Sequence, residues 1–367
     1  MSLNRIAPEI EEPEGLGESL DTYWSDYPLD TLLIRSETRT VFEILRRIEK
    51  GSFVMDPDFQ RDFIWSDDVQ SRFIESVLMR IPLPVFYLAE DENGRMIVVD
   101  GLQRLSTFRR FRNGNLNLKL KHQKLLHGKG FSDLSPKLQN RLEDCNLTLY
   151  VIDSKVPNRA RLDIFERVNS GVPLTRQQMR NCLYMGPATR FLRNEAETDI
   201  FLNATGNSLK TTTMRNREFV NRFCAFQLLD LGDYKGDMDD FLATCLIKMN
   251  VLPEVEIQRL SADFRTSLSN NLRVFGKHAF RKHRQHDGDR SVINASLWDV
   301  LSTGLSKYSE NIVEARADKL RNAFYPLMDD VDFVDSITIG TSDTRKVRHR
   351  FAVIKALFEG VFDADKA

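Results

Sequence analysis

Cysteines and long apolar runs are scarce in this chain of 367 residues. Its four cysteines stand far apart with no CxxC pair among them: Cys145, Cys182, Cys224 and Cys245. That spacing argues against a zinc ribbon, a thioredoxin-like site and a disulfide scaffold. No apolar run reaches the ~18 residues that a membrane span needs. The N-terminus is acidic and lacks the features of a signal peptide, so we expect a cytoplasmic protein.

Net charge is also nearly absent, since 52 Lys and Arg oppose 53 Asp and Glu to leave −1. Taken alone, this value argues against a strongly basic nucleic-acid binder. The charge is unevenly distributed, however. Residues 1–30 hold eight acidic residues and one basic residue, whereas residues 101–130 hold eight basic residues and no acidic one. The chain is therefore divided into an acidic arm and a basic segment.

Strand and helix signals alternate in the first third of the chain. Val41–Ile48 carries its apolar side chains on one helical face, and Ser66 followed by two aspartates is typical of a helix start. Two short apolar runs at 85–88 and 96–99 flank a turn and predict a hairpin. This order predicts a small α/β domain.

From about Phe131 onward the pattern is mainly helical. The clearest case is Met238–Met249, where apolar residues recur at helical spacing. We therefore expect an α+β protein with a flexible acidic arm over residues 1–30. A small α/β domain over residues 31–125 and a larger all-α domain over residues 126–367 would follow.

The strongest local motif is DGLQRLST, residues 100–107, which follows a predicted strand and opens a predicted helix. Gly101 lets the backbone approach a ligand closely, and free amides at a helix start attract anions. Arg104 lies in the first turn, where the helix dipole disfavours a cation. A bound phosphate would remove this conflict. The alternative is a tight turn in which Arg104 pairs with a nearby carboxylate.

Two further segments carry mixed polar and aromatic side chains. In PDFQRDFIW, residues 57–65, aromatic and guanidinium planes could hold a nucleobase, although the aromatics could equally belong to the core. In FERVNSGVPLTRQQMRN, residues 165–181, Thr175 and Gln178 predict a capping box. That box leaves the Asn169 amide without a structural role, so it could face a site.

With these three motifs in this order, the chain resembles the GmrSD-type restriction endonuclease N-terminal domain family, which has a ParB/sulfiredoxin-like core. Residues 275–283 (FGKHAFRKH) and 342–351 (SDTRKVRHRF) also look like the family. The resemblance implies an activity on nucleotides or nucleic acids, commonly in defence against foreign DNA. It includes the binding and hydrolysis of NTPs.

Carried over by position, the resemblance implies a catalytic cluster of Asp100, Gln103 and Arg104. The implied nucleotide contacts are Gly101, Gln60, Arg61 and Asn169. Leu102 stands where the family motif has a glutamine, so the resemblance supports binding more strongly than hydrolysis. Mg²⁺ could enter with the NTP, held mostly by phosphates and by one carboxylate, for which Asp100 is the candidate.

The basic segment, residues 101–130, is the expected nucleic-acid surface. Its candidate contacts to DNA or RNA phosphates are Arg109, Arg110, Arg112, Lys119 and Lys121. The alternation of Leu116, Leu118 and Leu120 with polar residues predicts a strand with one cationic side. The alternative is that the acidic arm folds over this surface.

No nuclease or Walker-type motif is present in the sequence. His278, His283 and His286 cluster, but lysines and arginines surround them, which favours a solvated basic loop over a metal site. Two other functions therefore stay open. The chain could be a DNA-binding or nicking module, or a non-catalytic scaffold that recruits a separate nuclease.

Overall fold

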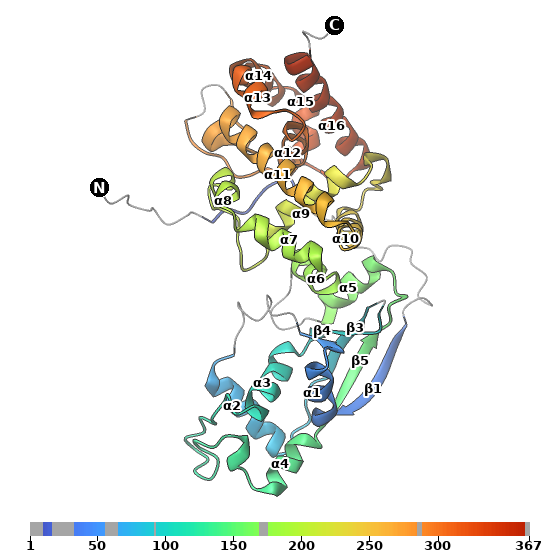
Figure 1. Ribbon diagram of the computed structural model, residues 1–367, viewed down its shortest axis with the longest axis vertical. Coiled ribbons are helices and arrows are strands. Elements are labelled where there is room, and N and C mark those ends of the chain that lie inside the picture. Colours follow the sequence, from blue (N-terminus) through green and yellow to red (C-terminus); the bar gives the residue numbers. More distant parts are fainter. Residues whose placement is uncertain are drawn as a thin grey trace, which may run out of the picture. The chain divides into compact units, whose positions relative to one another are not determined.

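The computed structural model describes residues 10–16, 33–55, 65–91, 93–168, 175–284 and 288–363. The chain forms two compact units (Figure 1). Unit 1 comprises Met1–Tyr23 with Tyr184–Ala367, and unit 2 comprises Trp24–Leu183. A mixed α/β part and a mostly helical remainder confirm the predicted fold class. The ParB/sulfiredoxin-like identity of the core stays a prediction.

Unit 2 is built on a five-stranded mixed sheet with the order β1-β5-β3-β4-β2. Its strands are β1 (Ile34–Thr40), β2 (Phe53–Val54), β3 (Phe86–Glu90), β4 (Met96–Asp100) and β5 (Asn146–Ile152). The antiparallel pairing of β3 with β4 confirms the predicted hairpin. Strand β5 lies between β1 and β3 and pairs antiparallel with β1 and parallel with β3.

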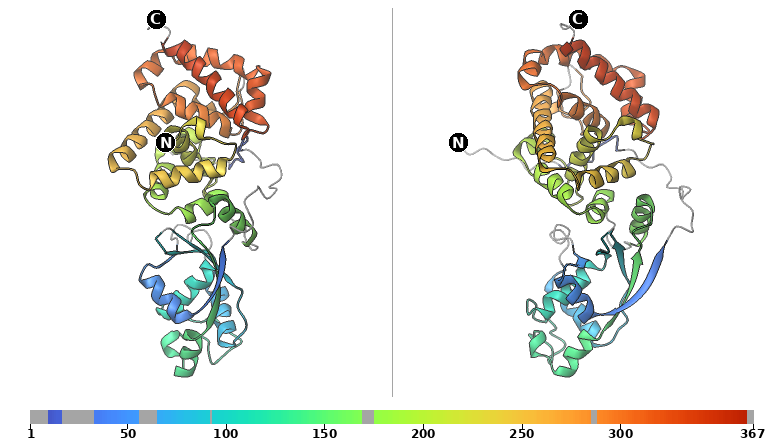
Figure 2. Two further views of the ribbon diagram at one scale, coloured as in Figure 1. Left: turned by 90° about the vertical axis from the view of Figure 1, so that its right-hand side faces the viewer. Right: turned by 45° about the vertical axis from the view of Figure 1, so that its right-hand side comes forward.

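Four helices cover one face of this sheet (Figures 1 and 2). They are α1 (Val41–Glu49), α2 (Asp67–Leu78), α3 (Leu102–Arg112) and α4 (Pro136–Glu143). Their apolar sides and the sheet form one core, which includes Ile44, Phe86 and Phe108. Ser66 caps α2 as predicted, because its hydroxyl accepts a hydrogen bond from the Val69 amide. The remaining helices of unit 2 are α5 (Asn158–Val168) and α6 (Arg176–Leu183).

Strand β5 was not expected, since the sequence analysis assigned everything after residue 125 to a helical domain. Leu147, Leu149 and Val151 alternate along β5 and are buried in the unit 2 core. Their burial explains why unit 2 continues to Leu183.

The predicted strand around Leu118 is wrong, although the alternation is real. Leu116, Leu118 and Leu120 are buried while their polar neighbours are exposed, but the segment forms no strand. Its backbone bonds are irregular: the Leu118 amide donates to Lys129 and the Lys119 amide to the Ser71 hydroxyl. The alternation of buried and exposed side chains therefore belongs to an extended loop in this segment.

Unit 1 is helical in its described residues. Its α-helices are α7 (Pro187–Ala196), α8 (Asp199–Thr205), α9 (Arg215–Leu228), α10 (Met238–Met249), α11 (Glu254–Phe275), α12 (Ala295–Leu305), α13 (Glu310–Ala315), α14 (Ala317–Phe324), α15 (Val331–Thr338) and α16 (Thr344–Phe358). Helix α10 has the predicted bounds. Short 3-10 turns lie at Phe131–Asp133, Leu231–Asp233, Gly276–His278 and Tyr325–Met328, and a π turn lies at Glu359–Asp363. Among the helices described, none is long and apolar enough to cross a membrane.

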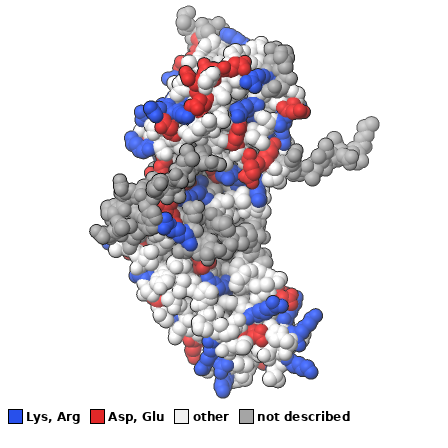
Figure 3. Space-filling view, turned by 180° about the vertical axis from the view of Figure 1, so that it is seen from behind, with Lys and Arg blue, Asp and Glu red and all other residues white. Residues whose placement is uncertain are grey.

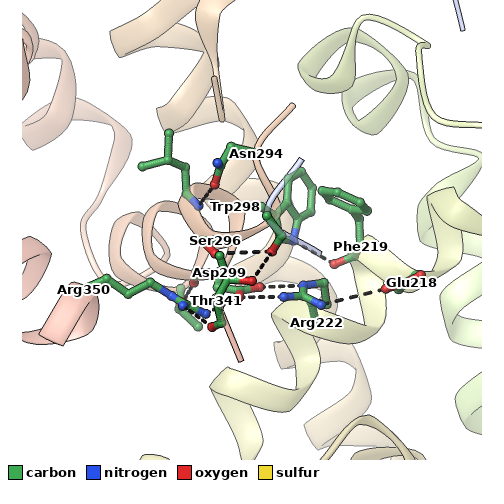
Figure 4. Close-up of polar contacts among 12 residues, drawn as sticks. Glu218, Phe219, Arg222, Asn294, Ser296, Trp298, Asp299, Thr341 and Arg350 are labelled. Carbon is green, nitrogen blue, oxygen red and sulfur yellow. Dashed lines mark hydrogen bonds and ion pairs between the residues drawn. The ribbon is translucent and has the colours of Figure 1, made fainter. Parts of the chain in front are cut away.

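Helix α12 lies at the centre of unit 1 and carries a buried carboxylate (Figure 4). Asp299 is fully buried and accepts hydrogen bonds from Arg222 Nε and Nη2 at 2.8 and 2.9 Å. Arg350 Nη2 donates to the same carboxylate at 3.2 Å. Arg350 belongs to the basic 342–351 segment, yet it is fully buried. Asp299 and two backbone carbonyls compensate the burial of its guanidinium group.

Replacing Asp299 by asparagine should destabilise unit 1 strongly. The change leaves two buried guanidinium groups without their shared anion, which typically costs about 3–5 kcal/mol. Chemical denaturation of the full chain measures this loss. Glu314→Gln removes an exposed partner of Arg273 and should cost under about 1 kcal/mol. Equal losses for the two variants would contradict a dominant role for the buried pair.

Candidate functional site

The candidate site begins where β4 ends and α3 starts. Asp100 is the last residue of β4, and Gly101 precedes α3 with φ 100° and ψ 7°. A Cβ atom on Gly101 would lie 2.2 Å from Cδ1 of Phe86. The left-handed backbone and the ring below it therefore both require glycine at this position. Gly101 also gives α3 no side-chain cap.

Arg104 lies in the first turn of α3, and its guanidinium points inward. Its Nη1 donates to the Pro84 carbonyl at 2.6 Å, and its Nη2 donates to the Val85 carbonyl at 3.1 Å. The same Nη2 pairs with Asp100 Oδ2 at 2.7 Å. The Arg104 Cζ atom also lies 4.2 Å from the centre of the Phe86 ring. Arg104 therefore pairs with a nearby carboxylate, as in the tight turn that the sequence left open as an alternative to phosphate binding.

The environment of Arg104 explains how a cation is tolerated at the helix start. Its side chain is only 10% exposed, and burial lowers the pKa of Arg104 while the Asp100 charge opposes that shift. The Asp100 carboxylate supplies the negative charge that the positive end of α3 favours. Arg104 and Asp100 therefore form one unit that ties α3 to the end of β4 and the start of β3.

Gln103 connects the site to the second motif. Its side-chain Oε1 accepts a hydrogen bond from the Trp65 amide at 3.1 Å, while its Nε2 makes no hydrogen bond within the described part of the chain. The end of the 57–65 motif is thereby fixed beside α3. Gln60 and Arg61 lie outside the described residues, so their predicted nucleotide contacts stay predictions.

The third motif contributes a helix that packs on β4. Thr175 and Gln178 form the predicted capping box: the Gln178 amide donates to Thr175 Oγ1 at 3.2 Å, and the Thr175 amide donates to Gln178 Oε1 at 2.8 Å. Helix α6 follows and packs against β4, the strand that ends at Asp100. Asn169 lies outside the described residues. The three motifs nevertheless converge on β4 and α3.

The basic segment surrounds the C-terminal part of α3 and the loop behind it. Asp67 pairs with two of its members, Arg110 at 3.1 Å and Lys119 at 3.0 Å. The hydrogen bonds from Lys119 and then Arg110 lower the pKa of Asp67. Arg112 pairs with Glu143 at 2.6 Å. About half of the predicted phosphate contacts are therefore already engaged within unit 2.

The other cations of this segment face solvent. Lys121, Lys124 and Lys129 are exposed and make no ion pair with any described residue, and Arg109 is half-buried and likewise unpaired there. Figure 3 shows Lys and Arg side chains of unit 2 on this face, with Asp and Glu side chains among them. These lysines keep a positive surface available for a polyanion.

Sequence reasoning missed two residues that shape the site. Phe86 is a core strand residue whose ring both excludes a Gly101 side chain and stacks under Arg104. Asp67 was interpreted only as a helix-start residue, yet it neutralises Arg110 and Lys119. The positions that they contact lie 15 residues or more away in sequence, so no local pattern could identify them.

The histidine cluster of unit 1 differs from the expected solvated loop. His283 is 5% exposed and stacks on His278 with ring centres 4.8 Å apart, and Arg281 is 1% exposed. His286 lies outside the described residues. No group of three or more His, Cys, Asp or Glu suited to a metal occurs in the described part of the chain.

Gly101→Ala should destabilise unit 2 far more than the same change elsewhere. It combines an unfavourable left-handed backbone, about 1–2 kcal/mol, with overpacking against Phe86, about 1–3 kcal/mol. Gly114→Ala is the matched control, since Gly114 also has positive φ (75°) but no atom within 4 Å of its Cβ position. Denaturation midpoints compare the two. A loss for Gly101→Ala no larger than the control would contradict the clash.

Comparison with known proteins places these motifs in one family. Residues 41–185 match the family model described as the GmrSD restriction endonuclease, N-terminal domain. The match contains all three motifs and nearly coincides with unit 2, whereas the segments 275–283 and 342–351 lie beyond it. No curated protein matches the chain. The match confirms the predicted resemblance, and the chain carries the GmrSD N-terminal domain over residues 41–185.

Proposed function

We propose that residues 41–185 bind an NTP at the start of α3 and hydrolyse it within a DNA restriction or anti-phage defence system. The family match supports the restriction and defence role. The nucleotide activity is proposed on one structural observation. This is the turn in which Asp100 and Arg104 flank Gly101 at an uncapped helix N-terminus.

The phosphates of the NTP lie against the backbone of this turn. The first amides of a helix have no carbonyl partner within the helix, and the helix dipole makes this end attractive to anions. The absence of a side chain at Gly101 lets a phosphate approach those amides closely. Gln103 adds its Nε2 as a neutral donor. By resemblance, Gln60, Arg61 and Asn169 complete the nucleotide contacts.

Arg104 positions Asp100, whose remaining carboxylate oxygen would either hold Mg²⁺ or orient the attacking water. The Arg104 guanidinium holds one oxygen of Asp100, Oδ2, while Oδ1 accepts no hydrogen bond from a described residue. That remaining oxygen fits the single carboxylate that magnesium bound to an NTP commonly needs. Mg²⁺ held by Oδ1 would neutralise phosphate charge. Because three internal partners already bind Arg104, positioning suits it better than direct phosphate contact.

The variant Asp100→Asn tests this proposal. We expect turnover of the NTP to fall at least ~100-fold because the oriented carboxylate is lost, while NTP affinity changes little. A turnover screen of all four NTPs, with and without DNA, measures the first quantity, and isothermal titration measures the second. Asp144→Asn, an exposed aspartate after α4, is the control and should retain activity. No NTP binding by the wild-type chain would overturn the nucleotide site.

A second candidate function is a DNA-binding module, and the exposed cations of the basic segment favour it. Lys121, Lys124 and Lys129 form no ion pair among the described residues, unlike Lys119. Such lysines bind a nucleic-acid backbone without reading bases. This module could work with a separate nuclease, as the restriction endonuclease family suggests.

The double variant Lys121→Ala with Lys124→Ala tests the DNA surface. Each lost phosphate contact should reduce the magnitude of the slope of log affinity against log salt concentration by about one. The double variant loses two contacts, so its slope should be smaller by about two. Fluorescence anisotropy with duplex DNA over a salt series measures this slope. Lys319→Ala, an exposed lysine of α14, should leave it unchanged. An unaltered slope in the double variant would exclude this segment.

A further inference from the structure

Residues 10–16 of the acidic arm are an ordered part of unit 1. Glu11 forms a parallel bridge with Leu209, and Glu14 forms one with Asn294. The Glu11 amide donates to the Ser208 carbonyl and the Glu14 amide to the Ile293 carbonyl, both at 2.9 Å. The described part of the arm is thus extended and bound to the helical unit.

The Glu11 carboxylate lies in a cationic pocket. Arg281 Nη1 donates to its Oε2 at 2.6 Å, and Arg290 Nη2 donates to its Oε1 at 2.7 Å. The Ile293 amide adds a third donor at 3.2 Å. Only 10% of the Glu11 side chain is exposed. A carboxylate with three donors and little solvent is a specifically recognised group.

Arg281 depends on Glu11 for its charge balance. Its side chain is 1% exposed, and its Nη2 is held by the Thr205 carbonyl at 3.0 Å. Burial lowers the pKa of Arg281, and the hydrogen bond and charge of Glu11 oppose this shift. Within the described residues, Glu11 is the carboxylate that pairs with it. Removing the Glu11 carboxylate would therefore leave a buried guanidinium without its described anionic partner.

A second recognition point lies three residues further along. Glu14 pairs with Lys282 at 2.9 Å and accepts from Asn294 Nδ2 at 3.3 Å. The intervening Glu12 is exposed and makes no hydrogen bond or ion pair with a described residue, whereas Pro13 is buried. The groove thus distinguishes neighbouring glutamates. Strand-like hydrogen bonds hold the extended backbone of residues 10–16. The side chains of Glu11 and Glu14, three residues apart, are bound by separate cationic residues.

These features are those of a bound peptide. Strand-like main-chain bonds give affinity, and side-chain pockets give specificity, as in known modes of extended-peptide recognition. Sixteen residues, 17–32, separate the segment from the described start of unit 2 at Leu33. A chain of that length can extend to about 50 Å, so it does not force the segment into the groove. The contacts themselves must hold it there.

We propose that the groove containing Arg281, Lys282 and Arg290 is a binding site for extended acidic peptides, with residues 10–16 as its resident ligand. A partner protein that presents two glutamates three residues apart in an extended segment displaces the resident and binds there. This proposal is independent of the nucleotide site in unit 2.

Displacement in the full chain tests the proposal without removing any part of the protein. A protease site inserted between Ser19 and Leu20 and a fluorophore at the N-terminus allow the segment to be cut while it is bound. Unlabelled synthetic peptide covering residues 8–18 is then added in excess, and release of the labelled fragment is followed by size exclusion and anisotropy. We expect the fragment to remain bound after cleavage and to be released by the peptide.

Two peptides of equal charge provide the specificity control. Glu11→Gln removes the carboxylate paired with Arg281, so the concentration required for displacement should rise at least tenfold. Glu12→Gln alters an exposed side chain and should match the wild-type peptide. Equal effects of the two changes would overturn the proposal, as would dissociation of the fragment directly on cleavage. Failure of the wild-type peptide to displace it would show that the segment is a permanent core element.

Discussion

The candidate site depends on the position of one guanidinium group. Arg104 binds two carbonyls before β3 and the carboxylate that ends β4, and it stacks on Phe86. The same ring leaves no space for a side chain at Gly101. The direction of α3, the backbone of the turn and the orientation of Asp100 are therefore coupled. A ligand at this turn meets a preformed arrangement, which is the condition for strong electrostatic stabilisation in a reaction.

Buried arginines balanced by distant acids recur in the chain, and they explain the basic motifs better than a single polyanion surface would. Arg281 comes from the 275–283 segment and pairs with Glu11; Arg350 comes from the 342–351 segment and pairs with Asp299. Each stabilises the folded state only together with its anion, because removing one partner leaves an uncompensated buried charge. A basic residue in these motifs is thus weak support for ligand binding.

Local patterns predicted several helices, but they could not predict these pairs. Helix α10 was predicted with its observed bounds because its apolar spacing matches one helical face. The capping box at Thr175 follows from two residues three apart. By contrast, Arg281 and Glu11 lie 270 residues apart, and the carbonyls that hold Arg104 lie about 20 residues before it. Strand β5 was not predicted, because its short alternation of buried residues lies between segments with helical spacing.

These contacts show which residues neutralise the charge that is unevenly distributed along the chain. The described glutamates of the arm neutralise Arg281, Lys282 and Arg290 of the helical unit. They contribute no ion pair to the basic segment, whose Lys and Arg pair instead with Asp67, Asp100 and Glu143. A net charge near zero is therefore the sum of separate local balances. Lys121, Lys124 and Lys129 of the basic segment keep their charge without an ion pair among the described residues, which is the property that the proposed DNA surface requires.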